Sequence, residues 1–372
     1  MKNVKKPIYW NPDKILEANA HYNIIVSGRS DGKTTGVEIY GLQQYVEHGE
    51  QMAIIRRWQD DIKSSNGMEM FNGLLNAGVL EEITGGEWTG IYYYARKYYL
   101  CRWEDDKRIT DKTPFCYAFA ISEMEHTKSS ADQPNVKTIL FDEFITRTVY
   151  IPNEFVLFTN LLSSIIRERG DVKIFMLGNT VTKFSPYFRE MGLKHIQKMK
   201  PGNLDVYTYG DSGLRVAVEL ADVAGKKDRK SNVYFAFDNP QLQMITTGTW
   251  EMAIYPHLPS DYYYAPKDVA AQYFIQFEGN TLQCEIVMKG AEAFTFVHAK
   301  TTPIRHPDTD IVYTPMPSTR RNFHRRISAP RTGLERRIWE FFLRDKVFYA
   351  DNEIGEIMRA YIQWSDSAGG MV

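Results

Sequence analysis

One stretch near the start of the chain combines the residue types that bind phosphate. An apolar run, Ile24 to Val26, leads into a glycine-containing loop and then into a helix-competent run from Lys33 to Tyr45. The loop and its first helical residues read Ser27, Gly28, Arg29, Ser30, Asp31, Gly32, Lys33, Thr34, Thr35. This fits G-x-x-x-x-G-K-[ST] at every fixed position but the first, where Ser27 replaces glycine. We therefore expect ATP here, with Lys33 on the β- and γ-phosphates and Thr34 on Mg²⁺. A turn that reads GKT by chance is the alternative.

A second stretch supplies two carboxylates. Val136 to Phe141 is an apolar, β-prone run that ends in Asp142 and Glu143, the layout of a buried strand delivering acids to the edge of a sheet. We expect Asp142 to complete the Mg²⁺ shell and Glu143 to accept a proton from the attacking water. An exposed turn is the alternative for this stretch alone. Together the two stretches predict an ATPase with an extra strand between its two motifs and a catalytic glutamate.

Three further groups of residues are candidates for the same site. Asn179 follows a predicted strand, Val172 to Leu177, and is expected to contact the γ-phosphate or the water, unless it belongs to an ordinary turn. Tyr9 and Asn11 are candidates for contacting adenine, and a hydrophobic staple on the following helix is an equal alternative. Arg56 and Arg57 end the predicted strand 51–58, where they are expected to face phosphate, DNA or a neighbouring subunit, or else to form a surface pair.

Composition limits the remaining possibilities. The chain has 372 residues, 43% of them hydrophobic, which is enough for two domains. Its net charge of −1 means that any contact with nucleic acid must come from local patches. Three separate cysteines predict buried thiols in a reducing compartment, and no apolar run has the length of a membrane span. We expect a soluble intracellular protein.

The pattern predicts an α/β fold with an N-terminal P-loop ATPase domain, built on a mainly parallel sheet, over residues 1–194. Residues 61–80 are expected to be helical, 91–103 to form β structure, and 151–166 to form a helix. A charged linker or lid is expected over 195–230. A smaller β-rich α+β domain is predicted over 231–372. It is indicated by short aromatic runs between turns, at 233–237, 249–255, 262–264, 273–277, 282–288 and 294–298, followed by helix-like stretches at 334–346 and 353–364.

The order of motifs resembles the DNA-packaging ATPases of small tailed phages of the phi29-like type, which are related to large terminase subunits and to FtsK/HerA-type P-loop ATPases. The resemblance covers about residues 5–190. It rests on Tyr9-Trp-Asn-Pro12, Gly28 to Thr34, Arg56-Arg57, Pro134-Asn-Val136, Phe141-Asp-Glu-Phe144, Tyr150-Ile-Pro-Asn-Glu154, Arg167 with Arg169, and Gly178-Asn179. It implies a motor that drives double-stranded DNA into an empty capsid through the portal. Such a motor works in the host cytoplasm and is absent from the mature virion.

The resemblance also implies roles for individual residues and partners. Arg167 matches the arginine that acts on the ATP of a neighbouring subunit, which implies a homo-oligomeric ring, expected to be a pentamer, with a packaging RNA as a possible further partner. The family can carry a lysine where this chain has Gln59. The contacts that this lysine makes with DNA or with the neighbouring subunit in the family are therefore assigned here to Lys128 or Arg57. The C-terminal domain is expected to be RNase H-like without an active nuclease site.

Residues 320–337 contain seven arginines and one acidic residue. In a nearly neutral chain this arginine cluster predicts a polyanion or an acidic partner, with Arg320, Arg321, Arg325 and Arg326 as the first candidates. Two other functions stay open at this point. One is a headful terminase with an active nuclease, and the other is a non-catalytic nucleic-acid-binding scaffold.

Overall fold

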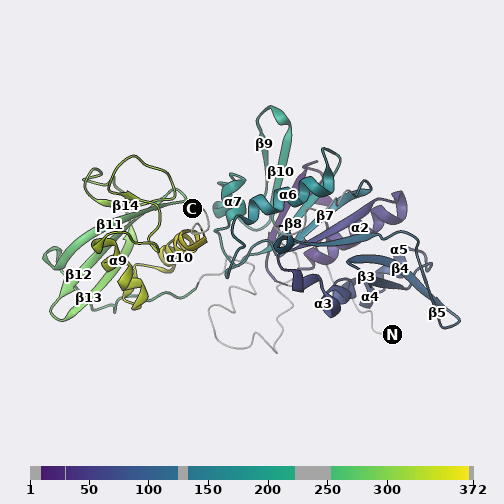
Figure 1. Cartoon of the computed structure of the whole chain (residues 1–372), viewed down its shortest axis with the longest axis horizontal. Coiled ribbons are helices and arrows are strands. Elements are labelled where there is room, and N and C mark those ends of the chain that lie inside the picture. The colour runs from purple at the N-terminus through teal and green to yellow at the C-terminus, as the bar shows by residue number, and fades with distance from the viewer. Residues whose placement is uncertain (1–9, 30, 125–132, 223–252, 368–372) are drawn as a thin grey trace. The chain divides into compact units, whose positions relative to one another are not determined.

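The computed structural model describes residues 10–29, 31–124, 133–222 and 253–367 (Figure 1). The chain divides into two compact units, residues 1–251 and 252–372. Each unit is built on its own sheet. The predicted α/β class is confirmed.

The first unit contains a ten-stranded sheet. Nine strands run in the order β3-β4-β6-β2-β7-β8-β1-β10-β9, and β5 pairs with β4. The strands are β1 Tyr22–Ser27, β2 Gln51–Arg56, β3 Gly90–Tyr94, β4 Lys97–Glu104, β5 Lys107–Thr110, β6 Cys116–Ala120, β7 Val136–Asp142, β8 Lys173–Asn179, β9 Leu204–Tyr209 and β10 Leu214–Leu220. The block from β6 to β10 is parallel, while β3, β4, β5 and β9 pair in antiparallel fashion.

The central strands are apolar because both faces of the sheet are covered. One face carries Ile24, Ala53, Ile139 and Phe141, which pack with helix α6, Glu154–Ile166. On the other face Ile25, Ile54 and Leu140 pack with α2, Lys33–His48. Strand β8 lies between β1 and β7, so the extra strand predicted between the two motifs is confirmed.

Short helices complete this unit. They are α1 Asp13–Leu16, α3 Ser64–Glu69, α4 Asn72–Asn76, α5 Val79–Ile83 and α7 Pro186–Glu190. The single helical pattern predicted over 61–80 is divided among a 3₁₀ turn, α3, α4 and the start of α5. Gly78, with a φ of 68°, separates α4 from α5, because this left-handed conformation stops an α-helix.

The predicted linker over residues 195–230 differs from the structure. Strands β9 and β10 occupy 204–220, and β10 pairs with β1 in the first sheet. Of the glycines and aspartates that suggested a connector, Gly202, Gly210, Asp211 and Gly213 lie in turns beside these two strands. Residues 223–230 fall outside the described part of the chain.

The second unit has a six-stranded sheet in the order β15-β14-β11-β12-β13-β16. Its elements are β11 Val269–Phe277, β12 Asn280–Lys289, β13 Glu292–Ala299, β14 Ile311–Tyr313, β15 Phe323–His324, α9 Gly333–Leu343, β16 Val347–Tyr349 and α10 Asn352–Ser367. The three longest strands form an antiparallel meander, and β14 runs parallel to β11. The strands predicted around 273–277, 282–288 and 294–298 are confirmed, as are the two helices, whereas the run predicted at 262–264 is irregular and forms no strand. The run predicted at 233–237 lies outside the described residues, as does the beginning of the run at 249–255.

Two sequence expectations about the chemistry of the chain are also met. Cys101, Cys116 and Cys284 are free and buried, and burial raises the pKa of each thiol. None of the helices in the described ranges has the length and apolar content needed to cross a bilayer.

Candidate nucleotide site at the carboxyl edge of the first sheet

The loop between β1 and α2 has the geometry of an anion cradle. Gly32 caps the 16-residue helix α2 with a φ of 77°, and the backbone N–H groups of the first turn of that helix face out of its end. The positive end of the helix dipole adds to them. Lys33 is 7% exposed, and its Nζ donates to the Oγ of Ser27 at 2.9 Å, the carbonyl oxygen of Gly28 at 3.0 Å and the Oδ1 of Asn179 at 3.0 Å.

The departure from the glycine pattern at Ser27 has a structural explanation. Ser27 is fully buried at the end of β1, where its hydroxyl donates to the carbonyl oxygen of Gly28 and accepts from Lys33. A glycine offers no such hydroxyl, so Ser27 adds an acceptor that holds the lysine within the loop. An anion in the cradle would compete with these acceptors for Lys33.

The second motif meets the first at the same edge of the sheet. The Oγ1 of Thr34 donates to the Oδ2 of Asp142 at 3.2 Å. A hydroxyl and a carboxylate so placed fit Mg²⁺, which takes one or two protein oxygens and completes its shell with phosphate and water. Glu143 follows with a φ of 57°, a left-handed conformation that is uncommon for a residue with a side chain, and it is exposed.

Arg56 ties the two acids together. Its guanidinium lies 3.5 Å from the Oδ2 of Asp142 and 3.1 Å from the Oε2 of Glu143. The side chain is one-fifth exposed. The structure therefore places Arg56 inside the candidate site rather than on a surface that faces DNA.

The expectation that Arg57 contacts DNA or a neighbouring subunit is wrong. Arg57 is 7% exposed, and its guanidinium donates to the Oε2 of Glu154 at 2.8 Å and to the carbonyl oxygens of Glu143 and Phe144 at 3.1 and 2.8 Å. It also lies over the ring of Tyr150. Arg57 thus fixes the backbone that follows Asp142, and it joins the beginning of α6 to the end of β2.

One buried acid escaped the sequence analysis. Glu38 lies one turn after Thr34 on α2 and is 3% exposed. Burial raises the pKa of its carboxyl well above the ordinary range. The negative charge of Asp142 raises it further, and the positive charge of Arg56 opposes the rise. A carboxyl in an otherwise amphipathic helix suggests a solvated face, so only the three-dimensional structure shows that it faces the sheet.

The remaining candidates either lie in the undescribed parts of the chain or make other contacts. Tyr9, Ser30 and Lys128 lie outside the described residues. The side-chain amide of Asn11 donates to the carboxyl of Asp13, and its oxygen accepts from the backbone N–H of Asp13 at the start of α1. This polar contact differs from the hydrophobic staple, and contact with adenine stays a prediction. Gln59 contacts Glu123 and is bonded by Lys63.

The arginine cluster lies in the second unit. Arg320, Arg321 and Arg325 are exposed, whereas Arg326 is half-buried. Arg320 lies 3.5 Å from Asp308, and Arg325 lies over the ring of Trp364. Among the described residues, no three acidic, histidine or cysteine side chains are grouped so that they would hold a metal ion.

The fold and the cradle together define a P-loop α/β protein of the class with an additional strand between its two nucleotide motifs. Within that class, the chain belongs to the family described as Podovirus DNA encapsidation protein (Gp16), whose sequence model matches residues 4–199. It is 30% identical to the DNA packaging protein of Bacillus phage phi29 over 187 residues. That alignment covers 49% of this chain and 50% of the relative, so the chain matches about half the length of its curated relative.

Two solved structures extend the likeness in fold beyond the family match. The phi-28 gp11 DNA packaging motor superimposes with a TM-score of 0.50 at 19% identity, over 97% of both chains. The bacteriophage phi-29 viral genome packaging motor assembly gives a TM-score of 0.52 at 18% identity, over 95% of this chain and 100% of that one. At these identities the likeness shows the fold.

Glu38→Gln is expected to make stability less dependent on pH. Because the folded state raises the pKa of this carboxyl, its stabilising effect is full below the unfolded pKa of glutamate and is lost as pH rises toward the folded pKa. Glutamine keeps the neutral shape. The difference in free energy of unfolding, variant minus wild type, should therefore increase by up to about 1.4 kcal/mol per pH unit across that window.

The measurement is urea unfolding between pH 5 and 8 without nucleotide or divalent cations. Glu81→Gln, an exposed change on α5, is the control and should show no such trend. A stability difference for Glu38→Gln that does not vary with pH would refute the neutral buried carboxyl.

Proposed function

We propose that this protein is an ATP-driven motor that moves double-stranded DNA into an empty phage capsid. The observation that carries the proposal is the meeting of Lys33, Thr34, Asp142 and Glu143 at one edge of the sheet. Membership of the DNA encapsidation family supports the substrate. The motor would act at the portal of the capsid in the host cytoplasm and leave before the virion matures, with a packaging RNA as a possible further partner.

In the proposed site, each residue has a chemical role. The loop from Ser27 to Thr35 wraps the phosphates of ATP, and Lys33 offsets their charge. Thr34 and Asp142 would hold Mg²⁺, which neutralises charge on the phosphates when it is bound. Glu143 accepts a proton from the attacking water, and Asn179, which already reaches Lys33, contacts the γ-phosphate or that water.

The ion pair between Arg56 and Glu143 sets a condition on turnover. The guanidinium of Arg56 lies 3.1 Å from the Oε2 of Glu143, so the pair occupies an oxygen that could accept a proton from water. Glu143 must therefore turn away from Arg56 before it activates water. Its left-handed backbone and exposed side chain leave room for that movement.

The position of Arg167 supports its action on another subunit. Helix α6 begins at Glu154, which binds Arg57 beside the nucleotide site, and ends at Ile166. Thirteen residues of helix span about 20 Å. After the helix, Arg169 donates to the carbonyl oxygens of Gln133, Pro134 and Val136, where β7 starts. Arg167 therefore lies at the opposite edge of the sheet from its own cradle, and a ring of copies, taken as a pentamer, brings it to the next one.

We assign the second unit to binding nucleic acid or the capsid. Its antiparallel meander, extended by strands parallel to the first, supports an RNase H-like sheet. The exposed arginines 320, 321 and 325 supply a local positive charge that the chain as a whole lacks.

Two substitutions test the chemistry of the site. Lys33→Ala should lose binding of Mg-ATP, because the charge opposite the phosphates is gone. Glu143→Gln should keep ATP binding and lose about 10²- to 10⁴-fold in turnover, since only the base is removed. Equilibrium binding of a fluorescent ATP analogue, beside steady-state phosphate release, separates these effects. Hydrolysis by Glu143→Gln at near the wild-type rate would show that another group is the base.

Mixing variants tests the action of Arg167. Arg167→Ala alone should lose about 10³-fold or more in turnover. Added Lys33→Ala chains should restore part of it, because their intact Arg167 reaches the intact cradles of the first variant. The matched control adds chains that carry both substitutions, which should restore nothing. Equal turnover in the two mixtures, once mixed rings are verified, would exclude action between subunits.

The arginine cluster has its own test. Replacing Arg320, Arg321, Arg325 and Arg326 by Gln should weaken DNA binding and lower the salt slope by about 0.7 to 0.9 per lost phosphate contact. Arg305→Gln, an exposed arginine of the same unit, is the control. If the cluster docks on an acidic capsid surface, DNA affinity stays intact and co-sedimentation with capsids fails. If neither the DNA affinity nor the co-sedimentation with capsids changes, both roles are refuted.

A further inference from the structure

The outer strands of the first sheet are covered on one face only. On that face, Tyr98 and Leu100 of β4 pack with the short helices through Phe71, Leu74 and Leu80. Helix α6 covers the opposite face at the centre of the sheet, where Leu161 and Leu162 belong to the core. The core that contains α6 includes no residue of β3, β4 or β5, and β5 reaches the outer end of this unit (Figure 1).

This uncovered face is aromatic and basic. Strand alternation places on it a set of six side chains, which we name the outer aromatic face: Tyr92, Tyr94, Lys97, Tyr99, Trp103 and Arg108. In the antiparallel register, Tyr92 pairs with Tyr99, and Trp103 pairs with Arg108. Tyr94 is 63% exposed and Trp103 is 64% exposed. The guanidinium of Arg108 lies 3.4 Å from the centre of the Tyr92 ring. Clustered, exposed aromatic side chains of this kind are typical of a protein interface.

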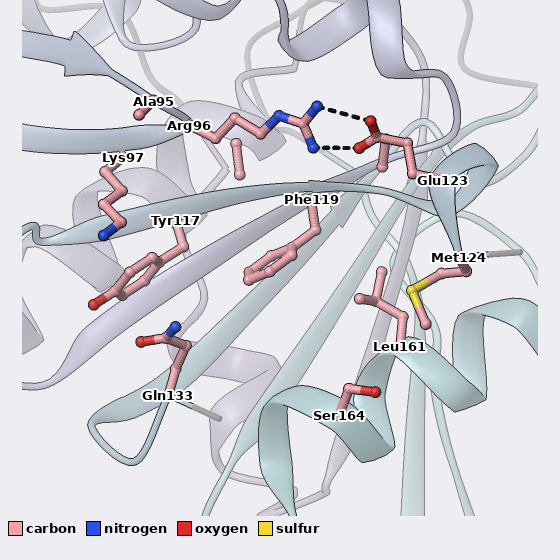
Figure 2. A pocket seen from close by; sticks show the side chains of 12 residues that line it. Ala95, Arg96, Lys97, Tyr117, Phe119, Glu123, Met124, Gln133, Leu161 and Ser164 are labelled. Atoms are coloured by element: carbon pink, nitrogen blue, oxygen red, sulfur yellow. Dashed lines mark hydrogen bonds and ion pairs between the residues drawn. The ribbon is translucent and has the colours of Figure 1, made fainter. Parts of the chain in front are cut away.

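A cavity of about 210 Å³ continues this face toward α6. Figure 2 shows Lys97 beside Tyr117, with Phe119, Gln133 and Ser164 around the same hollow. The guanidinium of Arg96 and the carboxylate of Glu123 pair across its upper side. The hollow offers a preformed recess next to a flat aromatic surface.

The cavity leads to the turn that carries Arg167. Ser164, which lines the cavity, lies three residues before Arg167, one helical turn away. Arg169 holds this turn against Gln133, another lining residue, at 2.9 Å. The outer aromatic face, the cavity and Arg167 therefore lie on one continuous side of the first unit.

Charge favours protein over nucleic acid as the occupant. The turn that joins β4 to β5 exposes Asp105 and Asp106, directly after Trp103 and Glu104. Lys107 and Arg108 follow these carboxylates directly, so the charge here is mixed and forms no continuous positive groove. Unpaired bases stack on such rings when a positive groove follows the backbone, which these acids interrupt.

We propose that the outer aromatic face is the surface on which a second copy of this chain docks, on the side from which Arg167 reaches the nucleotide of that copy. The inference rests on the proposed function, because it places the interface where a trans-acting arginine needs it. Such a contact is heterologous and closes into a ring when its rotation allows.

The first test introduces negative charge into the outer aromatic face. Tyr94→Glu with Trp103→Glu should shift the protein from assemblies to single chains in sedimentation velocity. At concentrations where the wild type is assembled, the same variant should lose at least tenfold in ATP turnover while still binding the ATP analogue. Tyr263→Glu, an equally exposed tyrosine of the second unit, is the matched control and should assemble normally. Unchanged assembly of the double variant would overturn the proposal.

The second test does not depend on activity. The photo-crosslinker p-benzoylphenylalanine in place of Tyr94 should yield crosslinked dimers and larger species, with peptides joined between two chains. Peptides joined only within one chain, or the absence of crosslinks, would overturn the proposal. So would a double variant that assembles normally but loses binding to a single-stranded oligonucleotide, because the face would then serve nucleic acid.

The two tests separate this inference from the proposed function. If Tyr94 crosslinks between copies while the assembly hydrolyses no ATP, the interface stands and the motor function fails. If the mixed Arg167 and Lys33 variants restore turnover while the Glu variants assemble like the wild type, only the interface fails.

Discussion

The fold depends on one constraint, which is that parallel strands end at the same edge of a sheet. Strands β1, β2, β7 and β8 deliver Ser27, Arg56, Asp142 and Asn179 to that edge. Charges gathered in so small a space are tolerated because they alternate in sign and are bonded. Lys33 bonds to Asn179, and Arg56 pairs with Asp142 and Glu143. Burial raises the pKa of the Glu38 carboxyl behind them well above its ordinary range.

Helix α6 connects the nucleotide edge of the sheet with the opposite edge. Arg57 and Glu154 fix the start of the helix beside the nucleotide cradle, and Arg169 fixes the turn after it against the beginning of β7. Its rigid length separates Arg167 from the cradle of the same chain. In the proposed motor, this separation makes each site incomplete until a neighbour is present, and it links hydrolysis to assembly.

The sequence predicted those parts of the fold and site whose signals are local. A strand, a glycine loop and a helix are contiguous between residues 22 and 48, and the run into Asp142 and Glu143 is continuous. Arg57 was misplaced because charged residues are ordinarily exposed, and its partner Glu154 lies 97 positions away. Glu38 was missed for the same reason. Strand β9 resembled a connector because its half-polar pattern is that of an edge strand. Strand β10 is mostly buried, and it was missed because its pairing with β1 spans nearly two hundred residues.

The central claim is that a nucleotide site on one chain is completed by another chain. Turnover per chain, measured at saturating Mg-ATP over a wide range of protein concentration, tests it most directly. The account predicts a rate near zero for isolated chains that rises steeply and reaches a plateau as sedimentation shows assembly. A rate per chain that stays constant across the transition from single chains to assemblies would contradict it.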